Sequence, residues 1–105
     1  MFFELREYVL QPGKCDEWVQ WMDEVVIPFQ VSRGMVITGS FVDAENNRYF
    51  WLRRFESEEE RERLYKAVYE SDWWKTEASP RVATLIDRTQ TRVSIVQATP
   101  RSVLR

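Results

Sequence analysis

The period at which apolar residues recur changes along this chain, and that change restricts the possible folds more than any other feature. Residues 2–10 alternate two kinds of side chain, as a β-strand does when its two faces differ. In residues 14–29 the apolar positions recur every three or four residues, which is typical of an amphipathic helix. Residues 35–43 and 47–55 are rich in β-branched and aromatic residues and predict a β-hairpin.

The second half of the chain predicts further helices and a last strand. Ser57 and Glu60 have the spacing of a capping box, so we expect a helix to begin at Ser57. Ser79-Pro80 favours the start of another helical segment, and residues 89–98 alternate again as a strand does. The order of these elements predicts an α+β fold, a ferredoxin-like βαββαβ antiparallel sheet with its helices on one face.

Pro28 lies inside the first predicted helix and interrupts its regular pattern. Proline has no backbone N–H, so one hydrogen bond of the helix cannot form there. We therefore expect either a kink near Glu24 or an early loosening of the last turn of the helix. We expect Gly34 to end the helix because glycine readily adopts a left-handed conformation.

The length and the charge of the chain limit its organisation and its partners. With 105 residues it has the size of one domain, so we expect residues 1–105 to form a single domain. The formal net charge is −2, and Lys and Arg are spread along the chain, which argues against nucleic-acid binding. No apolar run approaches the ~20 residues of a membrane span. Cys15 has no partner for a disulfide and no signal-peptide pattern is visible, so we expect a cytoplasmic protein.

The sequence contains no histidine, and this excludes several kinds of site. Histidine is the commonest general base, the commonest metal ligand and the usual axial ligand of haem. We therefore expect no metal site and no cofactor, and haem chemistry that depends on an axial histidine is excluded.

The predicted sheet would expose one face, because its helices cover only the other. The chain has five Trp, four Tyr and six Phe residues, more than one covered face readily buries. We expect Tyr8, Tyr49, Trp51 and Phe55 to lie on the uncovered face. A second copy related by a two-fold axis is the simplest cover, so we predict a homodimer whose two sheets enclose a cavity.

Five short segments carry a resemblance to a known family. They are ELREY at 4–8, PGK at 12–14, VIPFQ at 26–30, WLRRFES at 51–57 followed by ER at 60–61, and ESDWW at 70–74. In this order and with these gaps they resemble a NIPSNAP-family domain, and the resemblance extends from Phe2 to about Gln97. The family often has Trp where this chain has Arg53, which implies a changed pocket wall if that side chain faces inward.

The resemblance implies that residues 1–105 form one NIPSNAP-like, ferredoxin-like domain of the dimeric α/β-barrel class, in which two sheets surround a central pocket. It supplies no catalytic residues. It also implies a poorly defined function, because eukaryotic relatives are linked to mitochondrial and vesicle-associated roles and bacterial relatives are mostly uncharacterised.

Glu4, Arg6 and Tyr8 share one face of the first predicted strand and are the candidate catalytic residues. Arg6 or Arg53 can hold a carboxylate or enolate oxygen, and Tyr8 can donate a proton. Glu4 can act as a base if burial raises its pKa. The candidate ligand-binding residues are Arg6, Tyr8, Tyr49, Trp51, Arg53 and Trp74. The alternative is a structural ion-pair network that seals the dimer core, which the Arg6→Met variant tests by separating loss of assembly from loss of ligand binding.

Two further features have both a chemical and a structural interpretation. Trp73 and Trp74 can form a stacking platform for a planar ligand, or they can plug one end of the core, and we favour the plug. Cys15 opens a helix, where the helix dipole lowers a thiol pKa, but the chain has no histidine or second cysteine to activate it as a nucleophile.

Two functions from different classes remain open. In the first, the cavity binds a small planar or carboxylate-bearing ligand without turnover. In the second, the protein is a cofactor-independent monooxygenase or isomerase that acts on a small aromatic or carbonyl substrate, by analogy with other proteins of the same fold class. Tryptophan fluorescence detects a ligand in either case, and oxygen consumption or substrate loss distinguishes the two.

Overall fold

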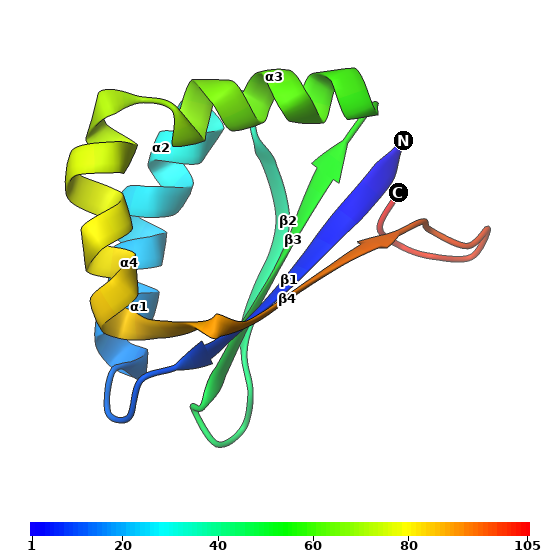
Figure 1. Ribbon diagram of the computed structural model, residues 1–105. Coiled ribbons are helices and arrows are strands. Elements are labelled where there is room, and N and C mark those ends of the chain that lie inside the picture. Colours follow the sequence, from blue (N-terminus) through cyan, green and yellow to red (C-terminus); the bar gives the residue numbers. More distant parts are fainter.

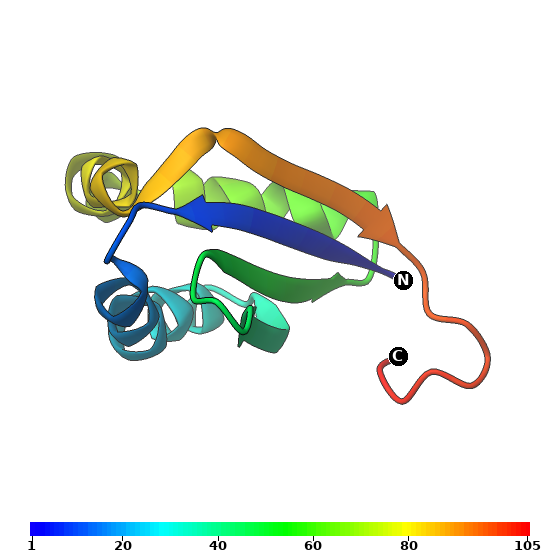
Figure 2. The same cartoon turned by 90° about the horizontal axis from the view of Figure 1, so that it is seen from below.

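The computed structural model describes residues 1–105 and shows a four-stranded antiparallel sheet with helices on one side (Figure 1). The elements in chain order are β1 (Phe2–Leu10), α1 (Cys15–Trp21), the π-helix η1 (Met22–Val26), α2 (Ile27–Ser32), β2 (Val36–Val42), β3 (Arg48–Phe55), α3 (Glu58–Tyr69), the π-helix η2 (Trp74–Ala78), α4 (Ser79–Leu85) and β4 (Ile86–Val96). The strand order in the sheet is β2-β3-β1-β4, and Figure 2 shows β1 between β4 and the β2–β3 hairpin. The ferredoxin-like α+β fold predicted from the sequence is confirmed.

Two helical segments contain a one-turn π-helix that ends two residues before a proline. Pro28 is the second residue of α2, directly after η1, and Pro80 is the second residue of α4, directly after η2. Because proline cannot donate to the carbonyl four residues earlier, the helix widens over that turn. The expected kink near Glu24 is therefore a π-helix that includes Glu24.

The ends of the helices follow their local sequence signals. Gly34 has φ +107°, and the N–H groups of Gly34 and Met35 donate to the carbonyl groups of Val31 and Gln30, each at 3.0 Å, which closes α2 with a glycine cap. At the start of α3 the Ser57 hydroxyl accepts from the Glu60 N–H at 3.1 Å, as expected for a capping box. None of the helices has the length and apolar composition needed to cross a membrane.

The aromatic residues expected on the uncovered face lie instead beneath the helices. Tyr8, Tyr49, Trp51 and Phe55 are at most 7% exposed. The ring of Trp18 in α1 packs against Tyr8 and Tyr49, with ring centroids 5.8 and 5.7 Å apart. The prediction of their face is therefore wrong, because alternation shows which residues share a face but not which face the helices cover.

The uncovered face carries the other set of strand residues. Leu5 pairs with Leu52, and Phe50 pairs with Phe41, so these side chains share that face. Phe41 is 57% exposed there. Beyond β4 the chain turns back, as Figures 1 and 2 show, and Leu104 lies with Phe3 around a shallow depression.

Candidate functional site

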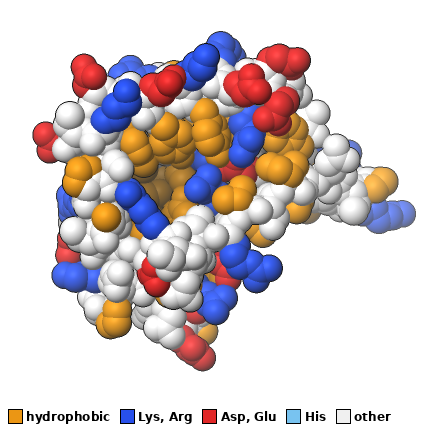
Figure 3. All heavy atoms as spheres, viewed as in Figure 1, with side chains coloured by type: hydrophobic (Ala, Val, Ile, Leu, Met, Phe, Trp, Pro, Cys, Tyr) orange, Lys and Arg blue, Asp and Glu red, His pale blue; other side chains and the backbone are white.

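A cavity of about 530 Å³ lies between the sheet and the helices of a single protomer. Figure 3 shows it as a hollow lined mainly by hydrophobic side chains, with basic side chains inside and at its rim. Its size is within the range of small-molecule sites. Four of the six residues expected to bind a ligand between two sheets thus line a cavity inside one chain.

The floor of the cavity comes from the two central strands. Arg6 and Tyr8 are two positions apart on β1 and therefore point to the same face of the sheet. Trp51 of β3 pairs directly with Arg6, and all three residues line the cavity. The Tyr8 hydroxyl accepts hydrogen bonds from Arg6 Nε at 2.9 Å and from Trp51 Nε1 at 3.1 Å, so the three side chains form one connected unit.

The walls come from the helices and include residues of both π-helices. Met22 and Val26 belong to η1 and Trp74 belongs to η2, and all three line the cavity. Tyr65 and Tyr69, one helical turn apart on α3, complete the aromatic wall. One-turn π-helices frequently occur at functional sites, and here the prolines that cause them also place side chains around the cavity.

A bulge in β4 forms the remaining side of the cavity. Glu7 of β1 pairs with Arg92 and Val9 pairs with Asp87, so residues 88–91 lie opposite Tyr8 alone. The Asp87 carboxylate stabilises this bulge by accepting from the Thr89 hydroxyl at 2.6 Å, from Gln90 Nε2 at 2.7 Å and from the Thr89 N–H at 3.0 Å, and these hydrogen bonds lower the pKa of Asp87.

The bulge places Arg88 and Thr91 in the cavity lining. Arg88 Nη2 donates to the carbonyl oxygen of Ser79 at 2.5 Å and to its hydroxyl group at 3.0 Å. This contact joins the bulge of β4 to the start of α4 across one side of the cavity. Arg88 is thus a second guanidinium group in the lining, beside Arg6.

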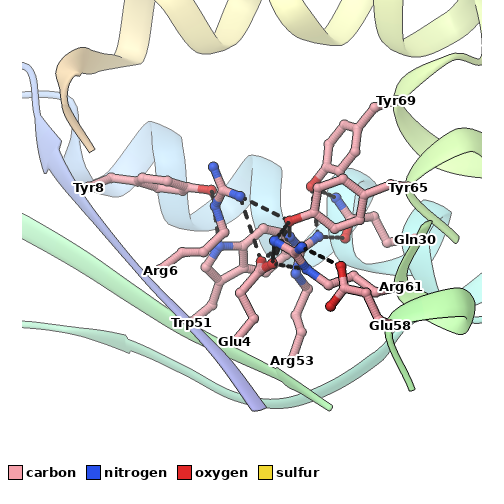
Figure 4. A network of polar contacts seen from close by, with 10 residues as sticks. All are labelled: Glu4, Arg6, Tyr8, Gln30, Trp51, Arg53, Glu58, Arg61, Tyr65 and Tyr69. Atoms are coloured by element: carbon pink, nitrogen blue, oxygen red, sulfur yellow. Dashed lines mark hydrogen bonds and ion pairs between the residues drawn. The ribbon is translucent and has the colours of Figure 1, made fainter. Parts of the chain in front are cut away.

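A buried ion-pair network adjoins the floor of the cavity (Figure 4). Its centre is the fully buried Glu4 carboxylate, which is 2.5 Å from Arg53 Nη2 and 2.7 Å from Arg61 Nη2. The Tyr65 hydroxyl also donates to this carboxylate at 2.5 Å. The Arg6 guanidinium lies further away, with Nη1 3.6 Å from Glu4 Oε1.

Arg53 is held by this network and does not line the cavity. Besides Glu4, its guanidinium donates to Gln30 Oε1 at 2.9 Å and to the Tyr69 hydroxyl at 2.7 Å, and it lies 4.5 Å from the ring centroid of Trp51. Arg53 therefore belongs to the layer behind the cavity wall and not to the wall itself. The network joins β1, β3 and α3 within one chain and does not lie between two sheets.

The Glu4 carboxylate is ionised and fully engaged. Burial raises its pKa, but the charge of Arg53 and the hydrogen bonds from Tyr65, Arg53 and Arg61 outweigh burial and lower the pKa to about 2. The condition under which Glu4 would act as a general base, a pKa raised by burial, is not met.

Tyr65 and Tyr8 remain protonated near neutral pH. Burial raises the pKa of Tyr65 to about 12, although the charge of Arg53 opposes it. Burial also raises the pKa of Tyr8, while the charge of Arg6 lowers it. Both phenols are therefore hydrogen-bond donors and not anions.

The structure brings together most, but not all, of the predicted ligand-binding residues. Arg6, Tyr8, Trp51 and Trp74 line the cavity. Tyr49 does not, because it is enclosed by Trp18 and Tyr8 and its hydroxyl contacts Ser40 at 2.5 Å. Arg53 is the other predicted residue outside the lining.

Trp73, Trp74 and Cys15 differ from one another in their surroundings. The Trp73 ring packs against Phe29 with centroids 4.6 Å apart, whereas Trp74 lines the cavity.

Cys15 begins α1, but burial and the nearby Asp16 and Asp43 raise its thiol pKa. A raised pKa is the opposite of what an activated nucleophile requires.

Several residues of the site were not among the sequence-based candidates. Tyr65 and Tyr69 share a face of α3 with the buried Leu64 and Val68, and two phenols on an otherwise apolar helix face are a signal of polar partners opposite them. No feature of the sequence indicated a role for Gln30 or Arg61 in the site, and the role of Arg88 depends on the bulge in β4.

No group of three or more Asp, Glu or Cys side chains is arranged to hold a metal ion.

Comparison with known proteins identifies the family of the chain. The sequence model of the NIPSNAP family matches residues 3–100. The chain belongs to the NIPSNAP family. The resemblance of the five short segments is thus confirmed over nearly the whole length of this NIPSNAP chain, and no curated protein matches the sequence.

Solved structures share the fold of this NIPSNAP chain. A NIPSNAP family protein from Agrobacterium tumefaciens has 24% sequence identity and a TM-score of 0.86, over 99% of this chain and 98% of that protein. A NIPSNAP family protein with unknown function from the same organism has 21% identity and a TM-score of 0.88, over 100% and 94%. An antibiotic biosynthesis monooxygenase has 16% identity and a TM-score of 0.66, over 95% and 100%. At these identities the similarity shows the fold and no shared activity.

Proposed function

We propose that this NIPSNAP domain binds a small planar ligand with a carboxylate group in the cavity between its sheet and its helices. One observation carries this proposal: the lining combines aromatic rings with two guanidinium groups, those of Arg6 and Arg88, and includes no carboxylate. Aromatic walls favour a flat apolar ligand, and guanidinium groups favour a carboxylate.

The charge of the adjoining network supports an anionic ligand. Glu4 and Glu58 are the two acids of the cluster, and Arg6, Arg53 and Arg61 are its three bases. One positive charge is therefore left without a partner. Because Arg6 is the most distant guanidinium from Glu4, it is the one with capacity for another anion.

Calorimetric titration tests the proposal with benzoate and indole-3-acetate as probes, and with benzamide and indole-3-acetamide as their neutral counterparts. We expect the carboxylates to bind and to change the fluorescence of Trp51 and Trp74, and we expect the amides to bind more weakly. The Arg6→Met variant removes a charge-assisted hydrogen bond of about 1.5–3 kcal/mol and should weaken carboxylate binding by about 10- to 100-fold.

The Arg92→Met variant is the matched control for Arg6→Met. Arg92 pairs with Glu7 in the β1–β4 ladder and does not line the cavity. It should bind benzoate as the unaltered protein does. Equal affinity of carboxylates and amides, or equal losses in the two variants, would contradict the proposal.

We also propose that the domain forms a homodimer through the uncovered face of its sheet. The neighbouring side chains of Leu5, Leu52, Phe50 and Phe41 form an apolar surface there, and covering it removes this area from water. Sedimentation at micromolar concentration tests this assembly, and a monomer would contradict it. The ligand cavity does not depend on it, because the cavity lies within one protomer.

The second candidate function is that of a cofactor-independent monooxygenase or isomerase acting on a small aromatic or carbonyl substrate. The similarity in fold to an antibiotic biosynthesis monooxygenase supports it, as does the presence of Arg6 and Tyr8 in the cavity, where an enolate oxygen could be held. The lack of a carboxylate in the lining argues against it, since the cavity then offers no acidic side chain as a proton acceptor. Oxygen consumption and loss of a bound aromatic ligand distinguish this function from binding alone.

A further inference from the structure

The Tyr8 hydroxyl group has a proton for which the protein offers no acceptor. Its oxygen accepts from Arg6 Nε and from Trp51 Nε1, and these two groups can only donate. A phenol oxygen with two accepted hydrogen bonds still has its own O–H to donate, and no protein acceptor lies within hydrogen-bond distance. Tyr8 is only 7% exposed and lines the cavity, so a group inside the cavity is the available acceptor.

Arg6 offers a second donor at the same place. Its Nε donates to Tyr8, and its Nη1 donates to the Tyr65 hydroxyl at 3.2 Å. Its Nη2 contacts no protein acceptor, and Figure 4 shows one guanidinium nitrogen of Arg6 pointing away from the network. The Nε–H and one Nη2–H of a guanidinium lie on the same edge and point in parallel. Because Nε binds the Tyr8 oxygen, Nη2 lies beside the Tyr8 O–H.

The surrounding charges make this pair of donors selective for an anion. Arg53 and Arg61 approach the Glu4 carboxylate to 2.5 and 2.7 Å, whereas Arg6 lies 3.6 Å from it. The charge of Arg6 is therefore the least compensated of the three. Burial keeps the pKa of Tyr8 raised, so its phenol is protonated and can donate near neutral pH.

We infer that the Tyr8 hydroxyl group and Arg6 Nη2 form a two-donor oxyanion site, which binds the ionised form of an oxygen attached to a planar ring or conjugated system. The ligand class is that of phenolates, enolates and aromatic carboxylates. The inference rests on the proposed function, because it assigns the atoms that hold the anionic group of the same ligand. It adds that the site favours the ionised form of a weakly acidic ligand and so lowers the pKa of the ligand when it is bound.

The experiment uses 4-nitrophenol, whose ionised form absorbs visible light. The absorbance of the bound ligand is followed as pH is varied, and its apparent pKa is compared with the value in free solution. We expect the protein to bind the phenolate form of 4-nitrophenol at least about tenfold more tightly than the neutral phenol form. This preference lowers the apparent pKa of the bound ligand by about one unit or more. A bound ligand whose pKa equals that in free solution would overturn the inference.

Two variants assign the effect to the two donors. Tyr8→Phe removes one donor and should weaken phenolate binding by about tenfold. Arg6→Gln keeps N–H donors but removes the charge, and it should abolish the preference for the phenolate while 4-nitrophenol still binds. It also keeps the inference testable if Tyr8→Phe fails to fold, which circular dichroism detects.

Tyr49→Phe is the matched control for Tyr8→Phe. Tyr49 pairs with Tyr8 across the strands, but its hydroxyl contacts Ser40 and it lies outside the cavity lining. It should leave the pKa of the bound ligand unchanged. An equal effect of both tyrosine variants would overturn the assignment to Tyr8.

The outcomes separate this inference from the proposed function. If 4-nitrophenol and benzoate bind but neither Tyr8→Phe nor Arg6→Gln changes the preference for the anion, the oxyanion site is refuted and the ligand cavity stands. If neither probe binds the unaltered protein, the proposed function is refuted together with the site.

Discussion

Replacing Glu4 by Gln should destabilise the domain in a way that depends on pH. Glu4 and Arg53 are both fully buried, and the carboxylate also accepts from Arg61 and Tyr65. The Glu4→Gln variant keeps the size of the side chain but removes the charge. Arg53 would then be a buried cation without its counter-ion, which is costly in the protein interior.

The magnitude follows from the depressed pKa of Glu4. Its ordinary value is 4.5 and its value in the fold is about 2. At about 1.4 kcal/mol per pKa unit, this difference corresponds to roughly 3 kcal/mol of the free energy of unfolding. Removing one partner of a buried ion pair costs about 3–5 kcal/mol, which agrees with this figure.

The sign of the pH dependence is fixed by the direction of the pKa change. A carboxyl group with a lower pKa in the folded state stabilises the fold fully above its unfolded pKa of 4.5. This stabilisation is lost as pH falls from 4.5 toward about 2. Urea unfolding followed by tryptophan fluorescence, at fixed protein concentration and at several pH values, measures the difference in unfolding free energy between the unaltered protein and Glu4→Gln.

We expect a difference of roughly 3 kcal/mol at pH 7 that shrinks as the pH falls below 4.5. The matched control is Glu7→Gln, because Glu7 lies on the same strand but pairs with the exposed Arg48 at 2.7 Å. A partly exposed pair contributes less than about 1 kcal/mol. A difference for Glu4→Gln that stays constant from pH 7 to the acid limit, or that is no larger than for Glu7→Gln, would falsify the reasoning.

Three further variants test other parts of the structure. Ser57→Ala removes the acceptor for the Glu60 N–H at the start of α3 and should lower the free energy of unfolding by about 1 kcal/mol in urea titration. An unchanged free energy of unfolding would contradict the capping role of Ser57. Gly34→Ala places a Cβ atom at φ +107°, 2.9 Å from Leu64 Cδ2, and should cost on the order of 1–3 kcal/mol in the same assay; an unchanged midpoint would contradict the strain. Phe41→Lys introduces a charge on the uncovered face and should produce monomers in sedimentation, where we expect the unaltered protein to be dimeric; a dimer that persists in the variant would place the interface elsewhere.

The strand residues of the floor of the cavity were predictable from the sequence because strand geometry is local. The period of two places Arg6 and Tyr8 on one side of β1, and the hairpin and strand order bring Trp51 beside them. The contribution of Arg88 was not visible, because it depends on where β4 departs from regular pairing with β1. The separation of Arg53 from the cavity was not visible either, because Tyr69 and Gln30 reach it from distant helices.

Taken alone, the sequence determined the order of strands and helices, the interruption of the first helix before Pro28, the glycine end of α2 and the sets of residues that share a face. These features depend on backbone periodicity and on the chemistry of single residues. Only the tertiary structure decided which face of the sheet the helices cover. On β1 that covered face carries Glu4 and Arg6, which hydropathy alone would have assigned to solvent, and their burial is possible only because Arg53, Arg61 and Tyr65 arrive from other elements to satisfy them.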